Sequence, residues 1–209
     1  MGRNREFDDE AVLDRASRLF WRRGYEVVSV QELEASTGLG RGSLYNAFGD
    51  KEGLFLAALE RYVDRHGATP FRHLAERDVG RGIRRMLEAI VERMSDPANP
   101  RGCLLTNTSL AHGSGSSRID AAVAGKVREM EGLLEEAIAR AREEGQIEAD
   151  ASPRRLARFY GAVAQSLGVM HKALGNEAGL RAIVETAMRA WPARKAGGAA
   201  RGSRPRRRG

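Results

Sequence analysis

Residues 38 to 54 read GLGRGSLYNAFGDKEGL, and this stretch decides which fold the chain is expected to adopt. One interpretation is the glycine-rich phosphate loop of a dinucleotide-binding fold, because an apolar run, VVSV at residues 27 to 30, comes before it. That loop needs a third glycine three residues after the second, an acidic residue about 20 residues later and a surrounding βαβ unit. Position 43 holds Ser43 and no second strand is predicted, so we exclude a dinucleotide site.

The same glycines suit a helix-turn-helix, in which a short helix leads through a tight turn into a second helix that enters the major groove of DNA. Ser29 followed by Glu32 predicts a capping box at the start of a helix from Val30 to Ser36. The second helix is expected at about residues 41–48. A small internal core is expected from four apolar residues, Leu33, Ala35, Leu39 and Leu44.

The outer face of this unit carries the side chains expected to contact DNA. Arg41 and Asn46 have the donors and acceptors that read base edges or phosphates, and the hydroxyls of Ser43 and Tyr45 suit phosphates. Gly42 lets the backbone approach closely. An ordinary core role remains an alternative for Tyr45 and is expected for Phe48, which faces inward by its spacing. The candidate DNA-binding residues are Ser29, Arg41, Gly42, Ser43, Tyr45, Asn46 and Lys51, the last beside free N–H groups of the next helix.

Apolar residues recur at helical spacing along almost the whole chain, and glycine or proline interrupts the pattern at regular intervals. This pattern predicts an all-α protein. A first helix is expected to begin at the acidic run after Phe7 and to end before Gly24, and a fourth to begin after Asp50 and end near Arg65. Longer helices are expected at residues 72–95, 102–111, 117–144, 152–174 and 177–191.

Three parts are expected: a helix-turn-helix unit with its linking helix at residues 1–66, a larger helical bundle at 67–193, and a disordered basic tail at 194–209. The tail holds seven basic residues and no acidic one, so it accounts for the net charge of +7. Either the tail adds sequence-independent affinity for DNA by releasing counterions, or it is a dispensable extension. Residues 1–66 hold ten basic and twelve acidic residues, so the prediction of DNA binding rests on the motif.

Composition excludes several other classes of protein. No apolar run is long enough to span a membrane, and the N-terminus lacks the apolar stretch of a signal peptide, so a cytoplasmic protein is expected. The only cysteine, Cys103, rules out an internal disulfide and a cysteine-based zinc site. The four histidines never fall at ligand spacing, and no metal or cofactor is expected.

The run SVQELEASTGLGRGSLYNAFGDKEGLFLAAL resembles the helix-turn-helix of tetracycline-repressor-type (TetR/AcrR) transcriptional regulators. The likeness covers about Ala11 to Tyr62, and the pattern L-Y-x-x-F-x-x-K-x-x-L from Leu44 to Leu54 is its most specific part. Gly49 and Asp50 depart from the pattern, because many relatives have a proline there. The resemblance implies a homodimeric repressor that binds double-stranded operator DNA and is released by a small-molecule effector. It also implies that residues 67–193 bind this effector and form the dimer.

The last two predicted helices have broad apolar faces that one molecule has little left to cover. We therefore expect a two-fold four-helix interface, as the resemblance also implies; an internal core is the alternative. Small residues such as Gly161 and Gly168 would let a partner helix approach. The faces are formed by Leu156, Phe159, Tyr160, Val163, Leu167 and Met170 on the first helix, and by Leu180, Ile183, Val184, Ala187 and Met188 on the second.

The run PRGCLLTNT at residues 100–108 resembles a subgroup of the same family that has Gly-Cys-Leu-Leu at this place. Methionines from neighbouring helices could line an adaptable pocket around it. Cys103, close to a helix N-terminus and with Arg101 turned inward, would be a reactive thiol that senses an electrophile or oxidant. Alternatively Cys103 only fills the core. The candidate ligand-binding residues are Cys103, Asn107, Met86, Met94, Met130 and Phe159.

Two other functions compete with transcriptional regulation. An enzyme would need paired carboxylates in a cleft, metal spacing or a nucleophile with a base, and none is found. A helical interaction protein with a helix-turn-helix-like head is the second; it would not bind duplex DNA with sequence preference. Activation rather than repression stays open, as do the effector and the operator sequence.

Overall fold

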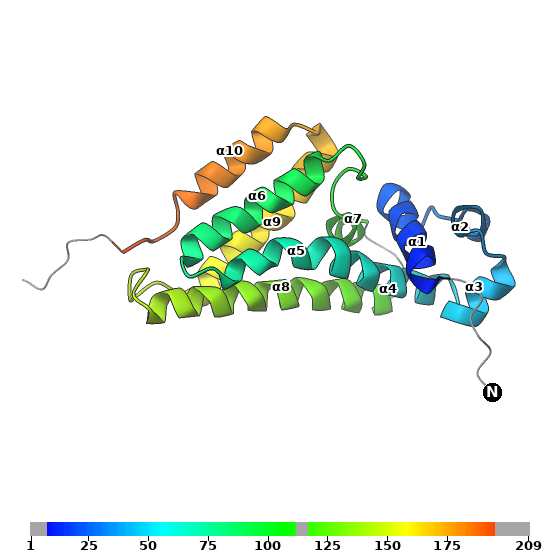
Figure 1. Ribbon diagram of the computed structural model, residues 1–209, viewed down its shortest axis with the longest axis horizontal. Helices are drawn as coiled ribbons and strands as arrows, with labels where there is room; N and C mark the ends of the chain where they lie inside the picture. Colours follow the sequence, from blue (N-terminus) through cyan, green and yellow to red (C-terminus); the bar gives the residue numbers. More distant parts are fainter. Residues whose placement is uncertain (1–7, 112–116, 195–209) are drawn as a thin grey trace, which may run out of the picture.

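The computed structural model describes residues 8–111 and 117–194, and these residues form helices and a single isolated β-bridge between Ile147 and Ala193. The all-α prediction is confirmed. The molecule is elongated, with a small head of helices at one end and a longer bundle at the other (Figure 1). Of the predicted basic tail only Arg194 lies among the described residues.

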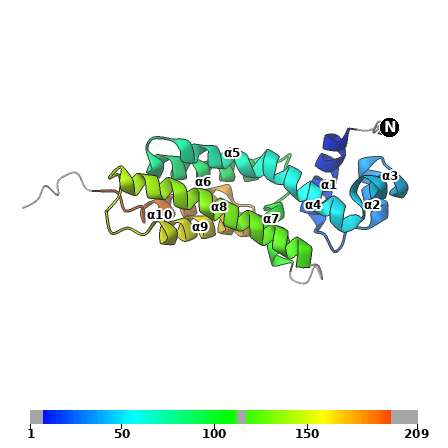
Figure 2. The same ribbon diagram turned by 90° about the horizontal axis from the view of Figure 1, so that it is seen from below.

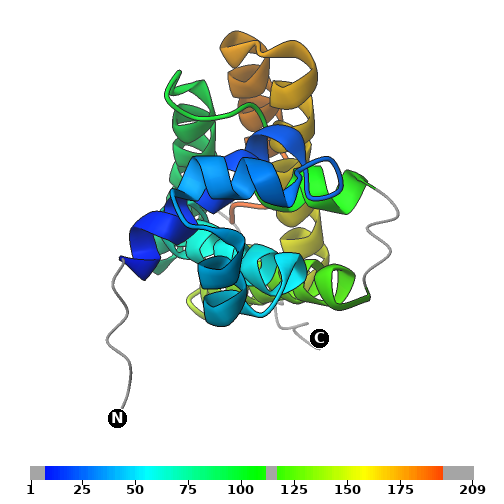
Figure 3. The same cartoon turned by 90° about the vertical axis from the view of Figure 1, so that its right-hand side faces the viewer.

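The head consists of α1 (Asp9–Arg23), α2 (Val30–Thr37) and α3 (Arg41–Phe48), packed against α4 (Lys51–Tyr62). The predicted caps are present. Asp50 Oδ1 accepts a hydrogen bond from the Gly53 N–H at 2.7 Å, and Ser29 and Glu32 form the capping box at the start of α2. Leu33 and Leu44 are buried in the head as expected, whereas Ala35 is exposed on the outer side of α2. Figure 3 looks onto this end of the molecule.

The helix that leaves the head does not stop near residue 66, where a break was expected. After α4 it continues through a π-helical turn, η1 (Val63–Gly67), then α5 (Ala68–Phe71) and a 3₁₀ turn, η2 (Arg72–Ala75). Pro70 lacks an N–H and would ordinarily interrupt a helix, but the π turn changes the hydrogen-bond register just before it. We call α4, η1, α5 and η2 together the rod.

The expected helix at 72–95 is correspondingly shorter. Its α-helical part, α6 (Val79–Ser95), begins where Asp78 accepts a hydrogen bond from the Arg81 N–H at 2.9 Å. Glu76 has an extended backbone and separates α6 from the rod. The short helix α7 (Leu104–Leu110) follows, then the long α8 (Ser117–Glu143), which runs along the bundle beside the rod (Figure 2).

The bundle is completed by α9 (Pro153–Leu174) and α10 (Glu177–Met188), and most of their apolar residues are buried inside the chain. Tyr160 and Leu167 of α9 are buried in the bundle core, together with Leu180, Val184 and Ala187 of α10. This corrects the expectation that these five residues face a partner, because α9 and α10 pack against each other and against α6 within the chain.

The small residue Gly168 also packs against another helix of the same chain. A Cβ added there would lie 3.1 Å from Thr106 Oγ1 and 3.3 Å from the Cys103 Cβ, so Gly168 allows α7 rather than a second molecule to approach α9. An apolar strip nevertheless remains exposed on the outer side of α9. Its large members are Phe159, Val169, Met170 and Leu174, and we call these four residues the α9 strip.

Candidate DNA interface and central cavity

The predicted DNA-contacting residues of α3 lie together on the open side of the head. Arg41, Gly42, Ser43 and Asn46 are exposed, while Leu44 on the opposite side of α3 is buried. Nothing lies within 4 Å of the position that a Cβ on Gly42 would take, so the backbone there is open to a close neighbour. This helix face has the width and chemistry to enter a major groove.

Two contacts fix the start of α3. Gly40 is its N-cap and offers no side chain, and the carboxylate of Glu34 instead accepts a hydrogen bond from the Arg41 N–H at 2.6 Å. The guanidinium of Arg41 lies 5.2 Å from the centre of the Tyr45 ring, which is half-buried against the core of the head. Tyr45 therefore has a packing role as well as an available hydroxyl.

Ser29 and Lys51 are held by the head in a different way. The Ser29 hydroxyl is engaged with Glu32 in the capping box, so its first role is to begin α2. Lys51 lies over the Tyr25 ring with Nζ 4.5 Å from the ring centre, and Nζ also donates to the Glu26 carbonyl at 3.4 Å. Burial lowers the pKa of Lys51, with the nearby acids Glu26 and Glu32 opposing this effect.

The turn between α3 and α4 depends on a glycine. A Cβ added to Gly53 would lie 2.0 Å from the Phe48 carbonyl oxygen and 3.2 Å from its carbon. Because both are backbone atoms, they cannot rotate away as a side chain could. Gly53 therefore fixes how closely the end of α3 approaches the first turn of α4.

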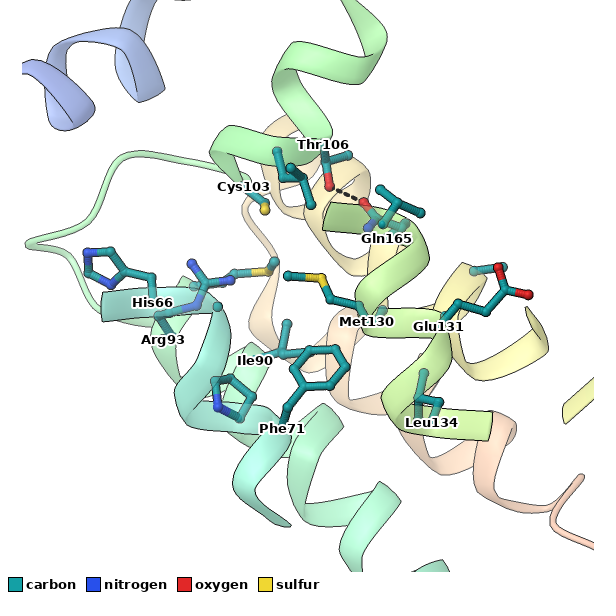
Figure 4. Close-up of a pocket in the computed structure, with 18 of the residues that line it drawn as sticks. His66, Phe71, Ile90, Arg93, Cys103, Thr106, Met130, Glu131, Leu134 and Gln165 are labelled. Carbon is teal, nitrogen blue, oxygen red and sulfur yellow. Dashed lines mark hydrogen bonds between the residues drawn. The ribbon is translucent and has the colours of Figure 1, made fainter. Parts of the chain in front are cut away.

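The bundle encloses a cavity of about 330 Å³ between the rod, α6, α7, α8 and α9. Figure 4 shows side chains from these helices converging on it. The Thr106 hydroxyl and Gln165 Oε1 are hydrogen-bonded to each other at 2.5 Å, and Arg158 Nε pairs with Glu131 at 2.9 Å. The other main lining residues are Tyr62, His66, Phe71, Ile90, Arg93, Met94, Cys103, Leu105, Met130 and Leu134.

Three of the six predicted ligand-binding residues line this cavity: Cys103, Met94 and Met130. The other three do not. Met86 is completely buried in the core of the bundle, and Phe159 belongs to the exposed α9 strip. Asn107 is buried outside the lining, where its Nδ2 donates to the Trp21 carbonyl at 3.3 Å and so joins α7 to α1. The helical spacing of apolar residues indicates which side chains face the interior. It does not indicate which residues of other helices they contact.

The surroundings of Cys103 differ from the expected ones. Arg101 is exposed and lies over Gly175, so it does not turn toward the thiol. Instead the hydroxyl of Tyr62 donates to Cys103 Sγ at 3.3 Å. Burial raises the pKa of Tyr62, and the neighbouring Cys103 adds to this effect. The phenol therefore stays protonated and can keep donating.

An aromatic group connects the cavity to the head. The Trp21 ring of α1 meets Tyr62 at 5.0 Å and His66 at 5.5 Å between ring centres, and the Arg93 guanidinium lies 5.8 Å from Trp21. Burial lowers the pKa of His66, and the charge of Arg93 lowers it further. We call Trp21, Tyr62, His66 and Arg93 the junction cluster.

Tyr62, His66 and Arg93 were not among the ligand-binding residues predicted from the sequence. One signal was available for Arg93, which lies between Ile90 and Met94 near the apolar side of α6. Tyr62 and His66 come from a helix that was expected to end just there. Among residues 8–111 and 117–194, no group of three or more side chains could hold a metal ion, and no helix has the length and apolar character needed to cross a membrane.

Two family models match the chain. Residues 12–58 match bacterial regulatory proteins of the tetR family, and residues 80–191 match a tetracyclin repressor-like C-terminal domain. The first match contains α2 and α3, and the second contains α7 to α10 and all of α6 except its first residue.

Individual relatives agree with these matches. The HTH-type transcriptional repressor ComR of Escherichia coli is 30% identical over 193 residues, which cover 91% of this chain and 92% of ComR. A cysteine variant of the TetR family regulator CifR, solved with a 26-base-pair operator duplex, is 35% identical with a TM-score of 0.85, covering 91% of this chain and all of that one. The reduced form of E. coli NemR has a TM-score of 0.76 at 21% identity, covering 88% and 98%, and shows the shared fold.

Proposed function

This chain belongs to the tetR family of bacterial regulatory proteins, which are transcriptional regulators, and we propose that it is a homodimeric repressor released from a pseudo-palindromic operator by a small-molecule effector. The observation that carries this proposal is the rod. One unbroken helical path runs from beside the recognition helix α3 to the wall of the cavity. A ligand that displaces this wall therefore acts directly on the helix that supports α3.

The proposed DNA contacts divide into two kinds. Arg41 and Asn46 are exposed polar residues without a fixed side-chain hydrogen bond among the described residues, and we assign them to base edges. Tyr45, held by packing, suits a phosphate, with Ser43, Gly42, Ser29 and Lys51 at the border of the contact. ComR is named a repressor and CifR was solved on operator DNA, which supports this role.

The base and phosphate roles predict different losses on substitution. Replacing Arg41 or Asn46 by alanine should weaken binding to the operator by about 10-fold or more and leave binding to random DNA much less affected, because a base contact contributes ~1–3 kcal/mol of discrimination. Tyr45→Phe should weaken both by a similar, smaller factor. Gel shifts on the two duplexes measure this, with Arg77→Ala at the far end of the bundle as the control. Equal losses on both duplexes for Arg41→Ala would contradict base reading.

Dimer formation is proposed to use the α9 strip. A palindromic site needs two recognition helices related by a two-fold axis. The strip leaves four large apolar side chains exposed along one side of α9, with Val169 and Met170 each 37% and Leu174 64% exposed. Adjoining residues of α10 would complete the contact. Both belong to residues 67–193, the part proposed to bind the effector and form the dimer.

Cys103 is proposed to respond to electrophiles that enter the cavity. Its sulfur lies at the lining, within hydrogen-bond distance of the Tyr62 hydroxyl on α4. Addition of the thiol to a quinone forms one C–S bond. The thiol proton moves to one ring oxygen and the hydrogen of the attacked carbon moves to the other, giving a hydroquinone thioether. This product adds a ring beside Tyr62 and thus presses on the rod.

The response of Cys103 can be separated from simple packing. We expect p-benzoquinone to release wild-type protein from operator DNA at concentrations at which Cys103→Ser stays bound, because serine cannot form the adduct. Titrated gel shifts measure the release, and mass spectrometry measures the adduct. Identical release curves for the two proteins would show that Cys103 only packs and that the effector binds reversibly.

A further inference from the structure

The guanidinium of Arg93 is partly buried, and within the described part of the chain it forms no ion pair with a carboxylate. Its Nη1 donates to the Tyr62 hydroxyl at 3.2 Å, and its Nε is buried without a hydrogen-bond partner. The described carboxylates form their ion pairs elsewhere, such as Asp14 with Arg61 and Arg65 on the outside of the rod. A charged donor left unsatisfied in a partly buried site is costly, and an anion placed beside it would offset that cost.

The other polar groups of the cavity are already matched. Glu131 and Arg158 neutralise each other, and Thr106 is hydrogen-bonded to Gln165. His66 lies beside Arg93, and its lowered pKa keeps the imidazole uncharged near neutral pH. The charge that remains without a partner at this wall is therefore the single positive charge of Arg93.

The remaining surface of the cavity is apolar. Phe71, Ile90, Met94, Met130 and Leu134 line it, and the two thioethers can adapt to differently shaped ligands. The volume of about 330 Å³ is large enough for a small organic molecule. In Figure 4 Arg93 and His66 lie at one side of the cavity, and Met130 and Leu134 lie across from them.

From this arrangement we propose that the effector is an organic acid, with an apolar body in the cavity and one acidic oxygen group on the Arg93 guanidinium. The assignment rests on the proposed function, in which this cavity holds the effector. A carboxylate accepts two parallel hydrogen bonds from a guanidinium, and the free Nε with one Nη offers this geometry. This hydrogen bonding between Arg93 and the acid does not depend on whether the ligand also reacts with Cys103.

Binding of an acid at Arg93 would change the contacts that hold the head to the bundle. The same guanidinium holds the Tyr62 hydroxyl of α4 and lies over the Trp21 ring of α1. A ligand acid that binds the free Nε and one Nη reorients the guanidinium and so weakens these two contacts. The junction cluster then loses its only charged member, and the head is less firmly held to the bundle.

Matched pairs of acids and alcohols test the proposal without DNA. Full-length protein is titrated by calorimetry with decanoate and 4-phenylbutyrate, and with decanol and 4-phenylbutanol. We expect at least one acid to bind wild-type protein about 10-fold or more tightly than its alcohol, as for a hydrogen bond to a charged group. Arg93→Met should remove this preference and change alcohol binding less than about threefold. Arg81→Met, which removes an exposed guanidinium of α6 outside the cavity, should keep it.

Three results would overturn the proposal: no acid binds wild-type protein, the alcohols bind as well as the acids, or the preference survives Arg93→Met. Circular dichroism checks that the variant is folded. If it is not, Arg93→Lys is used instead, and it should retain a preference for acids that is weaker than that of wild type. Gel shifts with operator DNA are run separately. Loss of DNA binding with a retained acid preference would reject the proposed function and leave the ligand class standing.

Discussion

Glutamate at both Val169 and Met170 is expected to make the protein monomeric and to weaken operator binding by about 100-fold or more. Both residues belong to the α9 strip and are partly exposed in the single chain. In a dimer through this strip they would be buried, and burial of carboxylates without partners costs several kcal/mol in total. Loss of the dimer also removes the advantage of two linked half-site contacts, which is worth roughly 10² to 10⁴ in affinity.

Sedimentation velocity at micromolar concentration measures the oligomeric state of this double variant, and gel shifts measure its operator binding. Leu133→Glu is the matched control, because Leu133 is 43% exposed on α8 and lies outside the α9 strip. The control should remain dimeric and bind the operator normally. A double variant that sediments as a dimer would place the interface elsewhere.

The substitution Gly53→Ala is expected to lower the free energy of unfolding by about 2 kcal/mol or more, as overpacking against fixed atoms does. The added methyl group would lie 2.0 Å from the Phe48 carbonyl oxygen, so the end of α3 has to move away from α4. Because α3 carries the proposed base contacts, its displacement should also weaken operator binding.

Gly132→Ala is the appropriate control for Gly53→Ala. Gly132 is in the interior of α8, and nothing lies within 4 Å of its added Cβ. There alanine should stabilise the helix by roughly 0.5–1 kcal/mol. Urea unfolding followed by circular dichroism compares the two. If Gly53→Ala is as stable as Gly132→Ala and binds the operator normally, the close approach at the α3–α4 turn is not a constraint.

The head could be predicted from the sequence because the residues that begin and end its short helices lie close together in the sequence. Ser29 with Glu32, and Asp50 with Gly53, are within three residues of each other, so the capping hydrogen bonds depend on nearby sequence alone. Gly38 ends α2 in the left-handed conformation that glycine adopts easily. The seven DNA-contact assignments remain predictions.

The rod and the cavity could not be predicted in the same way. Pro70 indicates a break in local terms, yet the packing of Val63, Pro70 and Leu74 keeps the chain helical through the π turn. The junction cluster joins residue 21 to residues 62, 66 and 93, and no local pattern relates positions so far apart. Likewise, the periodicity of α9 and α10 marks an apolar side without saying whether the chain itself or a partner covers it.

Selection of bound duplexes from a pool of randomised DNA, followed by sequencing, tests most directly whether α3 reads an operator as part of a dimer. Wild-type protein should enrich an inverted repeat whose half-sites are about one helical turn, or a multiple of it, apart. The same selection with Arg41→Ala should lose the preference at symmetric positions of both half-sites. Enrichment of no sequence, or of a single site without two-fold symmetry, would contradict a dimeric repressor that reads DNA through α3.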